Sequence, residues 1–324
     1  MEPVSILLSA PEEPLEWGIE GMQPVGANGW RIAPPKVGKS WDMIEECYCL
    51  ATAQPVYGHF RVTKPRRVMV IEEEDPKHRV KRRIERIIRA HGGLSPSDEF
   101  LKVSIKKGFR LDDPKWREVL EFEIKSFKPE FCYLDVFNRL HAKDINDAQA
   151  MSEIVLFLDQ LNRDYGTAFI ILHHDRKNGQ GGDAHNEIMG SRVLGGFADA
   201  TIFFARTKEK GVLRVSVALK DEPEAGFEPE FLIRLMDTED GHGTLFEYLG
   251  AAPEKQASNA LKEQIKAILE AATDSLTIKE VADAAKVSKN TAQEHLDTLV
   301  DIKVALKDKP KRAWVYRINH GAQI

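Results

Sequence analysis

A short run of residues near the N-terminus has the types and the spacing that bind nucleotide phosphates. Residues 33–40 read APPKVGKS, which fits the phosphate-loop spacing G-x-x-x-x-G-K-[S/T] with alanine in the first glycine position. Gly38 allows close backbone approach, Lys39 carries positive charge to the β and γ phosphates, and Ser40 offers a hydroxyl to Mg²⁺. The sequence predicts an ATP and Mg²⁺ site made by Ala33, Pro34, Pro35, Lys36, Val37, Gly38, Lys39, Ser40 and Trp41.

Carboxylates stand at two positions where strands are expected to end. The apolar stretch 131–135 ends in Asp135, which suits a residue that holds Mg²⁺ from the second coordination sphere. Four more acids follow the expected strand 67–71, namely Glu72, Glu73, Glu74 and Asp75. Placing four carboxylates together is costly unless a positive charge or a water to be activated lies beside them. We therefore expect one of the four to act as a general base.

The elements that must position these residues follow from the apolar pattern. Ahead of residue 250, short apolar stretches alternate with helical ones, which is typical of βαβ units with a mostly parallel sheet. Strands are expected over residues 29–32, 68–71, 131–134, 168–172, 201–205 and 213–219, and helices over 41–53, 76–91 and 150–165. The predicted fold class is α/β, with a mostly parallel twisted sheet.

A chain of 324 residues exceeds the usual size of one domain, so a second, smaller domain is expected. We predict the α/β domain over 1–250, a linker over 251–258 and the second domain over 259–320. Its first helix carries Leu261 and Ile265, the pair Thr277 and Glu280 forms a capping box for the second, and Ser288 caps the third. Two apolar stretches, 302–306 and 313–318, follow. This order predicts a C-terminal winged helix-turn-helix.

The composition excludes several protein classes. With 42% apolar and 30% charged residues, the chain matches an ordinary globular protein. No apolar run approaches the ~18 residues that cross a bilayer. The start of the chain is unlike a secretory signal, so we expect a cytoplasmic protein without membrane contact. The three cysteines, Cys47, Cys49 and Cys132, are expected to be reduced core thiols.

The net charge of −5 is unevenly spread, because residues 303–318 hold six basic residues against a single acid. A basic end on an acidic body indicates a local nucleic-acid patch. The expected duplex DNA contacts are Lys289 and Asn290 at the start of the third helix and Lys309, Lys311 and Arg312 in the wing. Docking of a protein is the alternative, since Glu294 and Asp297 lie on the same helix. The basic helix 76–91 is expected to be a solvated face, with a DNA or subunit contact as its alternative.

Several of these motifs together resemble a family. Six motifs follow one another along the chain. The first two are residues 33–40 and 51–58; the third is 70–75, together with Arg79, Arg82 and Arg83. The fourth is Leu134 and Asp135, together with 139–141; the last two are 173–177 and 190–199. Together they resemble the RecA-like hexameric ATPases, in the branch of the plasmid replicative helicase RepA and its phage and mobile-element relatives. The resemblance covers residues 13–235. It implies a RecA-like core, ATP with Mg²⁺, and a ring of identical subunits, expected to be a hexamer.

The resemblance also implies roles for single residues. Glu74 matches the catalytic glutamate that aligns the attacking water, and His173 or His174 matches the sensor of the γ-phosphate. Two histidines at a strand end are otherwise structural or metal ligands. The glycine-rich loop 176–187 matches the segment that faces single-stranded DNA, with Arg176 and Lys177 as its contacts.

One position departs from the family pattern. Relatives carry a Lys-x-Arg pair that reaches the neighbouring subunit's γ-phosphate, whereas residues 217–222 keep only Lys220. Arg206 is a second source of the missing arginine, and slow hydrolysis is the other outcome.

Two functions from different classes remain open. The first is a ring-forming, ATP-driven helicase or translocase of a plasmid, phage or mobile element, with possible replication proteins as partners. The second is a DNA-binding regulator or assembly factor in which ATP gates assembly and no strand is unwound. A small-molecule kinase is disfavoured because nothing resembles a lid over a phosphate acceptor, and the C-terminal domain has no role in one.

Overall fold

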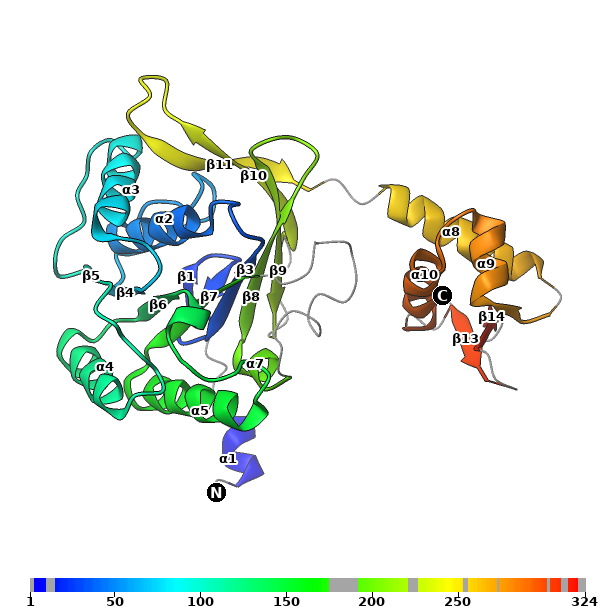
Figure 1. Cartoon of the computed structure of the whole chain (residues 1–324), viewed down its shortest axis with the longest axis horizontal. Helices are drawn as coiled ribbons and strands as arrows, with labels where there is room; N and C mark the ends of the chain where they lie inside the picture. The colour runs from blue at the N-terminus through cyan, green and yellow to red at the C-terminus, as the bar shows by residue number, and fades with distance from the viewer. Residues whose placement is uncertain are drawn as a thin grey trace. The chain divides into compact units, whose positions relative to one another are not determined.

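The computed structural model describes residues 3–9, 15–174, 192–220, 227–252, 256–272, 274–301, 304–309 and 314–319. The chain divides into two compact units, Met1–Ala252 and Pro253–Ile324. Figure 1 shows the sheet and helices of the first unit and the smaller helical unit. Among the described residues, no helix combines the length and the apolar character that crossing a membrane requires.

One nine-stranded sheet organises the described part of the first unit, in the order β11-β10-β9-β8-β3-β7-β6-β4-β5. From β8 to β5 the neighbouring strands run parallel, while β9, β10 and β11 are added antiparallel at the other end. The strands are β3 (Gly29–Ala33), β4 (Val68–Glu72), β5 (Leu101–Ile105), β6 (Phe131–Asp135), β7 (Ala168–His174), β8 (Ala200–Arg206), β9 (Val212–Leu219), β10 (Glu230–Asp237) and β11 (Thr244–Ala251). A separate short pair, β1 (Trp17–Ile19) and β2 (Gln23–Pro24), precedes the sheet.

Helices pack on both faces of this sheet (Figure 1). The elements are α1 (Val4–Ser9), α2 (Lys39–Thr52), α3 (Lys77–Ala90), α4 (Pro114–Phe127), the 3-10 turn η1 (Phe137–Arg139), α5 (Ala148–Tyr165) and α7 (Arg192–Phe197). Strand β4 shows the layering, because Val68 and Val70 join the core beneath α2 and α3 while Met69 and Ile71 join the core beneath α4 and α5. Alternate side chains of a buried strand serve opposite faces, which explains its continuous apolar sequence.

The expected α/β class and mostly parallel sheet are confirmed, as are the free, buried cysteines. The sequence analysis predicted no strand after residue 219, so it missed the hairpin β10–β11. The alternation of buried Phe231 and Ile233 was the available signal. The Gly and Asp content belongs to the turn between the strands, where Gly241 has a φ of 71°.

The C-terminal unit has its own apolar core, centred on Ile265, Val281, Leu296 and Tyr316. Its elements are α8 (Gln256–Ala271), β12 (Leu276–Thr277), α9 (Ile278–Ala285), α10 (Lys289–Asp301), β13 (Ala305–Asp308) and β14 (Val315–Ile318). The strands form an antiparallel sheet in the order β12-β14-β13. Helix α8 begins inside the segment predicted as linker, because residues 251–258 include the end of β11 and the first turn of this helix. The capping box of Thr277 and Glu280 is present.

A buried ion pair joins β3 to α2 on the two sides of the phosphate loop. Arg31 Nη2 lies 2.9 Å from Glu46 Oε2, and both side chains are fully buried. Burial alone would lower the pKa of Arg31, but the negative charge of Glu46 and its hydrogen bonds raise it. Tyr133 on β6 donates a hydrogen bond of 2.6 Å to the same Glu46 carboxylate. The pair therefore also connects α2 to a third element.

Replacing Arg31 with methionine should destabilise the protein by about 3–5 kcal/mol, because Glu46 would keep a buried negative charge without its partner. Urea denaturation at neutral pH measures this change. The control is Lys81→Met, which breaks an exposed pair with Glu85 and should cost less than ~1 kcal/mol. Equal losses in the two variants would show that the buried pair does not hold β3 to α2.

Candidate nucleotide-binding site

The predicted phosphate loop lies between β3 and α2. Ala33 is a buried strand residue paired with His174 of β7, so this position has regular strand geometry and does not require glycine. Gly38 does require it, because its φ is 99° and an added Cβ would lie 3.3 Å from the Phe246 ring. No side chain caps α2 at Gly38. The first backbone N–H groups of the helix are thus available to an anion such as phosphate.

The carboxyl ends of the parallel strands bring the predicted residues to the edge of the sheet that carries this loop. Glu72 ends β4 and is the register partner of Asp135, which ends β6. His174 ends β7 and is the register partner of Ala33, immediately before the loop. Ligands of open α/β sheets bind at this edge. Residues distant in the sequence are therefore neighbours here.

Lys39, His174 and Glu74 form a connected row. Lys39 Nζ lies 3.4 Å from His174 Nδ1, and His174 Nε2 lies 3.6 Å from Glu74 Oε1. The His174 contact lowers the pKa of the Glu74 carboxyl, and the charges of Lys39 and Arg139 act in the same direction. Burial lowers the pKa of Lys39, against the attraction of Asp135 and Glu74. Both Glu74 and His174 remain about one-third exposed, so this row can meet a ligand and water.

Glu72 and Asp135 form a different, buried arrangement. Burial and the neighbouring charge of Asp135 raise the pKa of Glu72 to about 9. Glu72 Oε1 also accepts hydrogen bonds from the backbone N–H groups of Glu74 and Asp75, at 2.6 and 2.7 Å. Burial raises the pKa of Asp135 as well, although the charge of Lys39 opposes that rise. Glu72 thus holds the turn after β4, and Asp135 is the buried carboxyl beside Lys39.

The remaining two acids of the run are engaged elsewhere. Glu73 accepts backbone hydrogen bonds of 2.9, 3.0 and 3.1 Å from Lys107, Gly108 and Phe109. Asp75 forms ion pairs with Arg79 and Arg83 of α3. The four neighbouring carboxylates therefore have four different environments. Glu74 is the one that faces Lys39 and His174.

The two histidines at the end of β7 also separate. His173 is buried, its ring lies against Trp30 and Phe137, and its Nδ1 lies 2.7 Å from the His174 carbonyl oxygen. Its neighbour His174 points to Lys39. Of the two alternatives left by the sequence, His174 is the one in contact with the phosphate-loop lysine.

Two candidate cations for contact between subunits are bonded within their own chain. Lys220 Nζ lies 2.8 Å from Asp199 Oδ1 and donates to the Gly196 carbonyl at 3.1 Å. Arg206 donates a hydrogen bond of 2.7 Å to the carbonyl oxygen of Pro35, inside the phosphate loop. Sequence reasoning did not foresee the Arg206 contact, because residues 35 and 206 meet only through the pairing of β3 with β8.

A cavity of about 530 Å³ opens next to the start of α2 and was not predicted. It is lined by Trp41, Arg82, Arg86, Leu235, Met236, Asp237 and Thr244. Arg86 of α3 binds Thr244 Oγ1 at 2.7 Å and Asp237 Oδ1 at 2.9 Å, which ties α3 to the β10–β11 hairpin. Part of the basic face of α3 therefore contacts the chain itself. Trp41, predicted from its place after the loop, is the residue that connects loop and cavity.

The candidate DNA contacts are only partly described. Lys289 and Asn290 are exposed at the start of α10, and Lys309 is exposed with its Nζ 5.2 Å from the Trp314 ring centre. Arg176 and Lys177, with the rest of the predicted loop to residue 187, lie outside the described residues. The same holds for Lys311 and Arg312.

A search of known families matches residues 3–180 to the AAA domain. The match spans more than half of the chain and includes the phosphate loop, the acid run and the row of Lys39, His174 and Glu74. This chain belongs to the AAA domain family. As a member of this family, the chain is a P-loop ATPase. No curated protein sequence matches it.

Two solved structures are similar to this chain. The first is a KaiC-like protein from Pyrococcus horikoshii. The alignment covers 73% of this chain and 99% of the KaiC-like chain, at 13% identity and a TM-score of 0.49. The second is a DnaB-like replicative helicase, from a structural study that also concerns its interactions with primase. The alignment covers 75% of this chain and 66% of the helicase chain, at 14% identity and a TM-score of 0.50. At 14% identity, the likeness to the DnaB-like helicase shows fold alone, and that fold is the RecA-like α/β core.

Proposed function

We propose that this AAA protein is an ATP-hydrolysing, ring-forming DNA motor, a helicase or translocase of a plasmid, phage or mobile element. The observation that supports this best is the row of Lys39, His174 and Glu74 at the carboxyl edge of the sheet. A positive charge for phosphate, a histidine and a partly exposed, ionised carboxylate stand side by side. Phosphoryl transfer to water needs these groups for positioning and charge stabilisation.

The roles follow from position in this row. Lys39 holds the β and γ phosphates, and Glu74 orients the attacking water, since its lowered pKa keeps it ionised. His174 lies between them, so its contacts change when a γ-phosphate reaches Lys39. It is therefore proposed as the sensor of the nucleotide state.

The residues present also fit Mg²⁺. Both carboxylate oxygens of Asp135 are buried and, among the described residues, lack a hydrogen-bond partner, which a hydrated cation would provide. Ser40, at the start of α2, would supply a hydroxyl ligand, and Asp135 would hold the ion from the second coordination sphere. Bound Mg²⁺ would neutralise charge on the β and γ phosphates.

The cavity beside the loop suits the nucleoside part of ATP. Trp41 offers an aromatic face, while Arg82 and Asp237 offer charged and hydrogen-bonding groups at the rim. A purine ring and ribose extending from phosphates at Gly38 would reach this space. Residues 33–41 are thus proposed as the cofactor-binding segment for the whole nucleotide.

DNA contact and ring formation rest on the family resemblance and on the C-terminal unit. Three helices followed by strands β13 and β14 support a winged helix-turn-helix, with α10 as the recognition helix. Lys307, also in this basic segment, is paired within the unit, because its Nζ lies 2.7 Å from Asp297 Oδ1. Lys289, Asn290, Lys309, Lys311 and Arg312 are proposed duplex contacts, and Arg176 and Lys177 are proposed single-strand contacts. A hexamer, with single-stranded DNA in its channel, is proposed as the working form.

One observation favours the second function, an ATP-gated DNA-binding regulator or assembly factor. Both candidates for a trans cation, Lys220 and Arg206, are bonded to groups of their own chain. The proposed trans role of Lys220 requires the ion pair with Asp199 to open when subunits meet. If it stays closed, hydrolysis is slow and the nucleotide acts as a switch.

Replacing Lys39 with alanine should abolish ATP turnover because the phosphates lose their cation. Glu74→Gln should retain ATP binding and lower the turnover rate by roughly 100-fold or more, because the amide cannot orient water as a carboxylate does. Phosphate release and the binding of a fluorescent ATP analogue measure the two effects.

The matched control is Glu73→Gln, which changes the neighbouring glutamate but leaves Glu74 intact. It should keep most of the turnover, since Glu73 holds the backbone of residues 107–109. Full activity in Glu74→Gln would move the catalytic role to Glu73 or Glu72.

Strand displacement on a forked duplex should distinguish the two functions. A motor separates the strands in the presence of ATP and Mg²⁺, and the Lys39→Ala variant does not, because opening base pairs requires free energy from hydrolysis. ATP-dependent assembly on DNA with no displaced strand would instead establish the regulator.

Binding to blunt duplex DNA without nucleotide should weaken as salt rises. Replacing Lys309, Lys311 and Arg312 with alanine should reduce the slope of log affinity against log salt by about 0.9 for each lost phosphate contact. Fluorescence anisotropy of the full chain measures the slope. Lys266→Ala is the control, because Lys266 faces Glu263 and Glu270 on α8. An unchanged slope in the triple variant would indicate that the tail docks a protein.

A further inference from the structure

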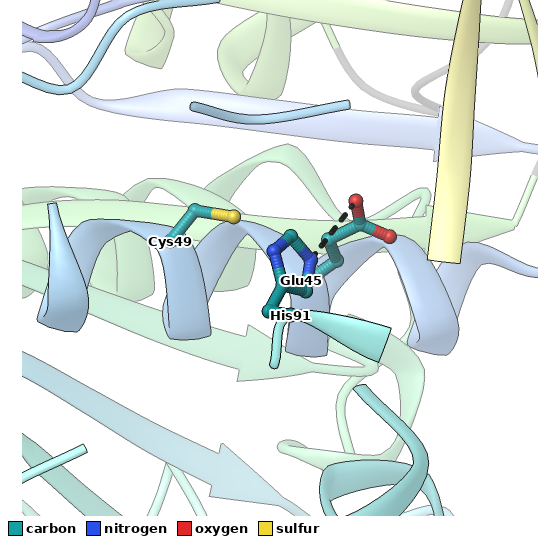
Figure 2. A group of neighbouring side chains, drawn as sticks. All are labelled: Glu45, Cys49 and His91. Atoms are coloured by element: carbon teal, nitrogen blue, oxygen red, sulfur yellow. Dashed lines mark ion pairs between the residues drawn. The ribbon is translucent and has the colours of Figure 1, made fainter. Parts of the chain in front are cut away.

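Three side chains with metal-binding atoms meet away from the phosphate loop. Glu45 and Cys49 are one helical turn apart on α2 and so lie on the same face. His91 directly follows α3. One ligand atom from each residue lies within 4.8 Å of the other two. Figure 2 shows the His91 ring between the Cys49 sulfur and the Glu45 carboxylate.

Two buried polar atoms of this cluster lack hydrogen bonds. The Glu45 side chain is 1% exposed and that of His91 is 11% exposed. Among the described residues, Glu45 Oε1 and His91 Nε2 have no hydrogen-bond partner, and only a long ion pair of 3.8 Å, the dashed line in Figure 2, joins them. A buried polar atom without a partner costs roughly 1–3 kcal/mol. Something that binds both atoms would remove that cost.

We propose that Glu45, Cys49 and His91 bind a zinc ion. A thiolate, an imidazole and a carboxylate are the three donor types that Zn²⁺ takes in proteins. Sulfur and nitrogen donors disfavour Mg²⁺ and Ca²⁺, which prefer oxygen. Three protein donors leave one position of a tetrahedron, which water can occupy. The site is separate from the Mg²⁺ proposed at Ser40 and Asp135.

The cluster needs only a small contraction to reach zinc geometry. With Zn–S near 2.3 Å and Zn–N near 2.0 Å, neighbouring ligand atoms of a tetrahedral site lie about 3.6 Å apart. Atoms now up to 4.8 Å apart would move by about 1 Å. His91 lies where the chain leaves α3, and Gly92 and Gly93 make the turn that follows, with φ of 81° and 84°.

The surroundings would orient two of the ligands. The backbone N–H of Phe246 donates a hydrogen bond of 2.7 Å to Glu45 Oε2, leaving Oε1 for the metal. The Tyr48 ring lies against the His91 ring with centroids 4.8 Å apart. Such outer contacts fix the direction of metal ligands. The partial exposure of His91 provides the entry path.

Binding would exchange a proton for the metal. Burial raises the pKa of the Cys49 thiol well above its ordinary value, so the metal-free protein holds the S–H form, whose sulfur lies 3.6 Å from the Pro55 carbonyl oxygen. Zinc would form the S–Zn bond as the S–H bond breaks, and the proton would leave to solvent. The ion would then join the middle of α2, the helix that starts at the phosphate loop, to the end of α3.

The test uses the full-length protein, stripped of metal with a chelator and then dialysed against Zn²⁺ or Co²⁺. About one zinc per chain should be retained, and Co²⁺ should give an absorption band from thiolate-to-metal charge transfer. Cys49→Ser should remove the charge-transfer band, and His91→Gln should lower zinc retention at least 10-fold. Cys47→Ser is the matched control, because it removes a buried thiol of the same helix that lies outside the cluster.

Thermal unfolding of the unaltered protein tests the site without any variant. It therefore gives a result even if a variant fails to fold. Zinc should raise its melting temperature, and a chelator should reverse the increase. Zinc retention well below one per chain, no charge-transfer band with Co²⁺, or the same zinc content in Cys49→Ser as in Cys47→Ser would each overturn the site. In that case Glu45 and His91 are a simple ion pair.

Discussion

The buried ion pair of Arg31 and Glu46 is the interaction on which the site most depends. Arg31 lies on the strand before the phosphate loop and Glu46 on the helix after it, so the pair fixes both ends of the loop relative to each other. A buried pair is weak evidence for net stability, because desolvation offsets much of the attraction. Its geometric effect is clearer. Tyr133 donates to the same carboxylate, so α2 also has a fixed position over β6, whose last residue is Asp135.

A second constraint is the cost of gathering charge at the carboxyl edge of the sheet. Each acid has a different environment that reduces this cost. Glu72 is largely protonated, Glu73 accepts hydrogen bonds from backbone N–H groups, and Asp75 forms ion pairs with arginines. Only Glu74 keeps an ionised, partly exposed carboxylate toward Lys39 and His174. When neighbouring acids have different environments, a site can contain a single reactive carboxylate among several.

Helix α2 links several features of the molecule. Its first turn carries Lys39 and Ser40, its middle carries Glu46 for the buried pair, and the face with Glu45 and Cys49 meets the end of α3. All of these contacts involve the same helix. The proposed nucleotide site, the buried ion pair and the proposed zinc site therefore share one helix. The C-terminal unit has its own apolar core.

The sequence by itself determined the α/β class, the phosphate loop and the capping of α9, because these depend on local spacing and on alternation along single elements. It did not determine which glutamate or histidine faces Lys39, since neighbouring residues in a turn take their direction from distant partners such as residues 107–109 and Trp30. The contact of Arg206 with Pro35 and the cluster of Cys49 with His91 also required the tertiary structure. In each case, the two residues meet only when separate strands and helices pack together. The spacing of residues along the chain does not predict such contacts.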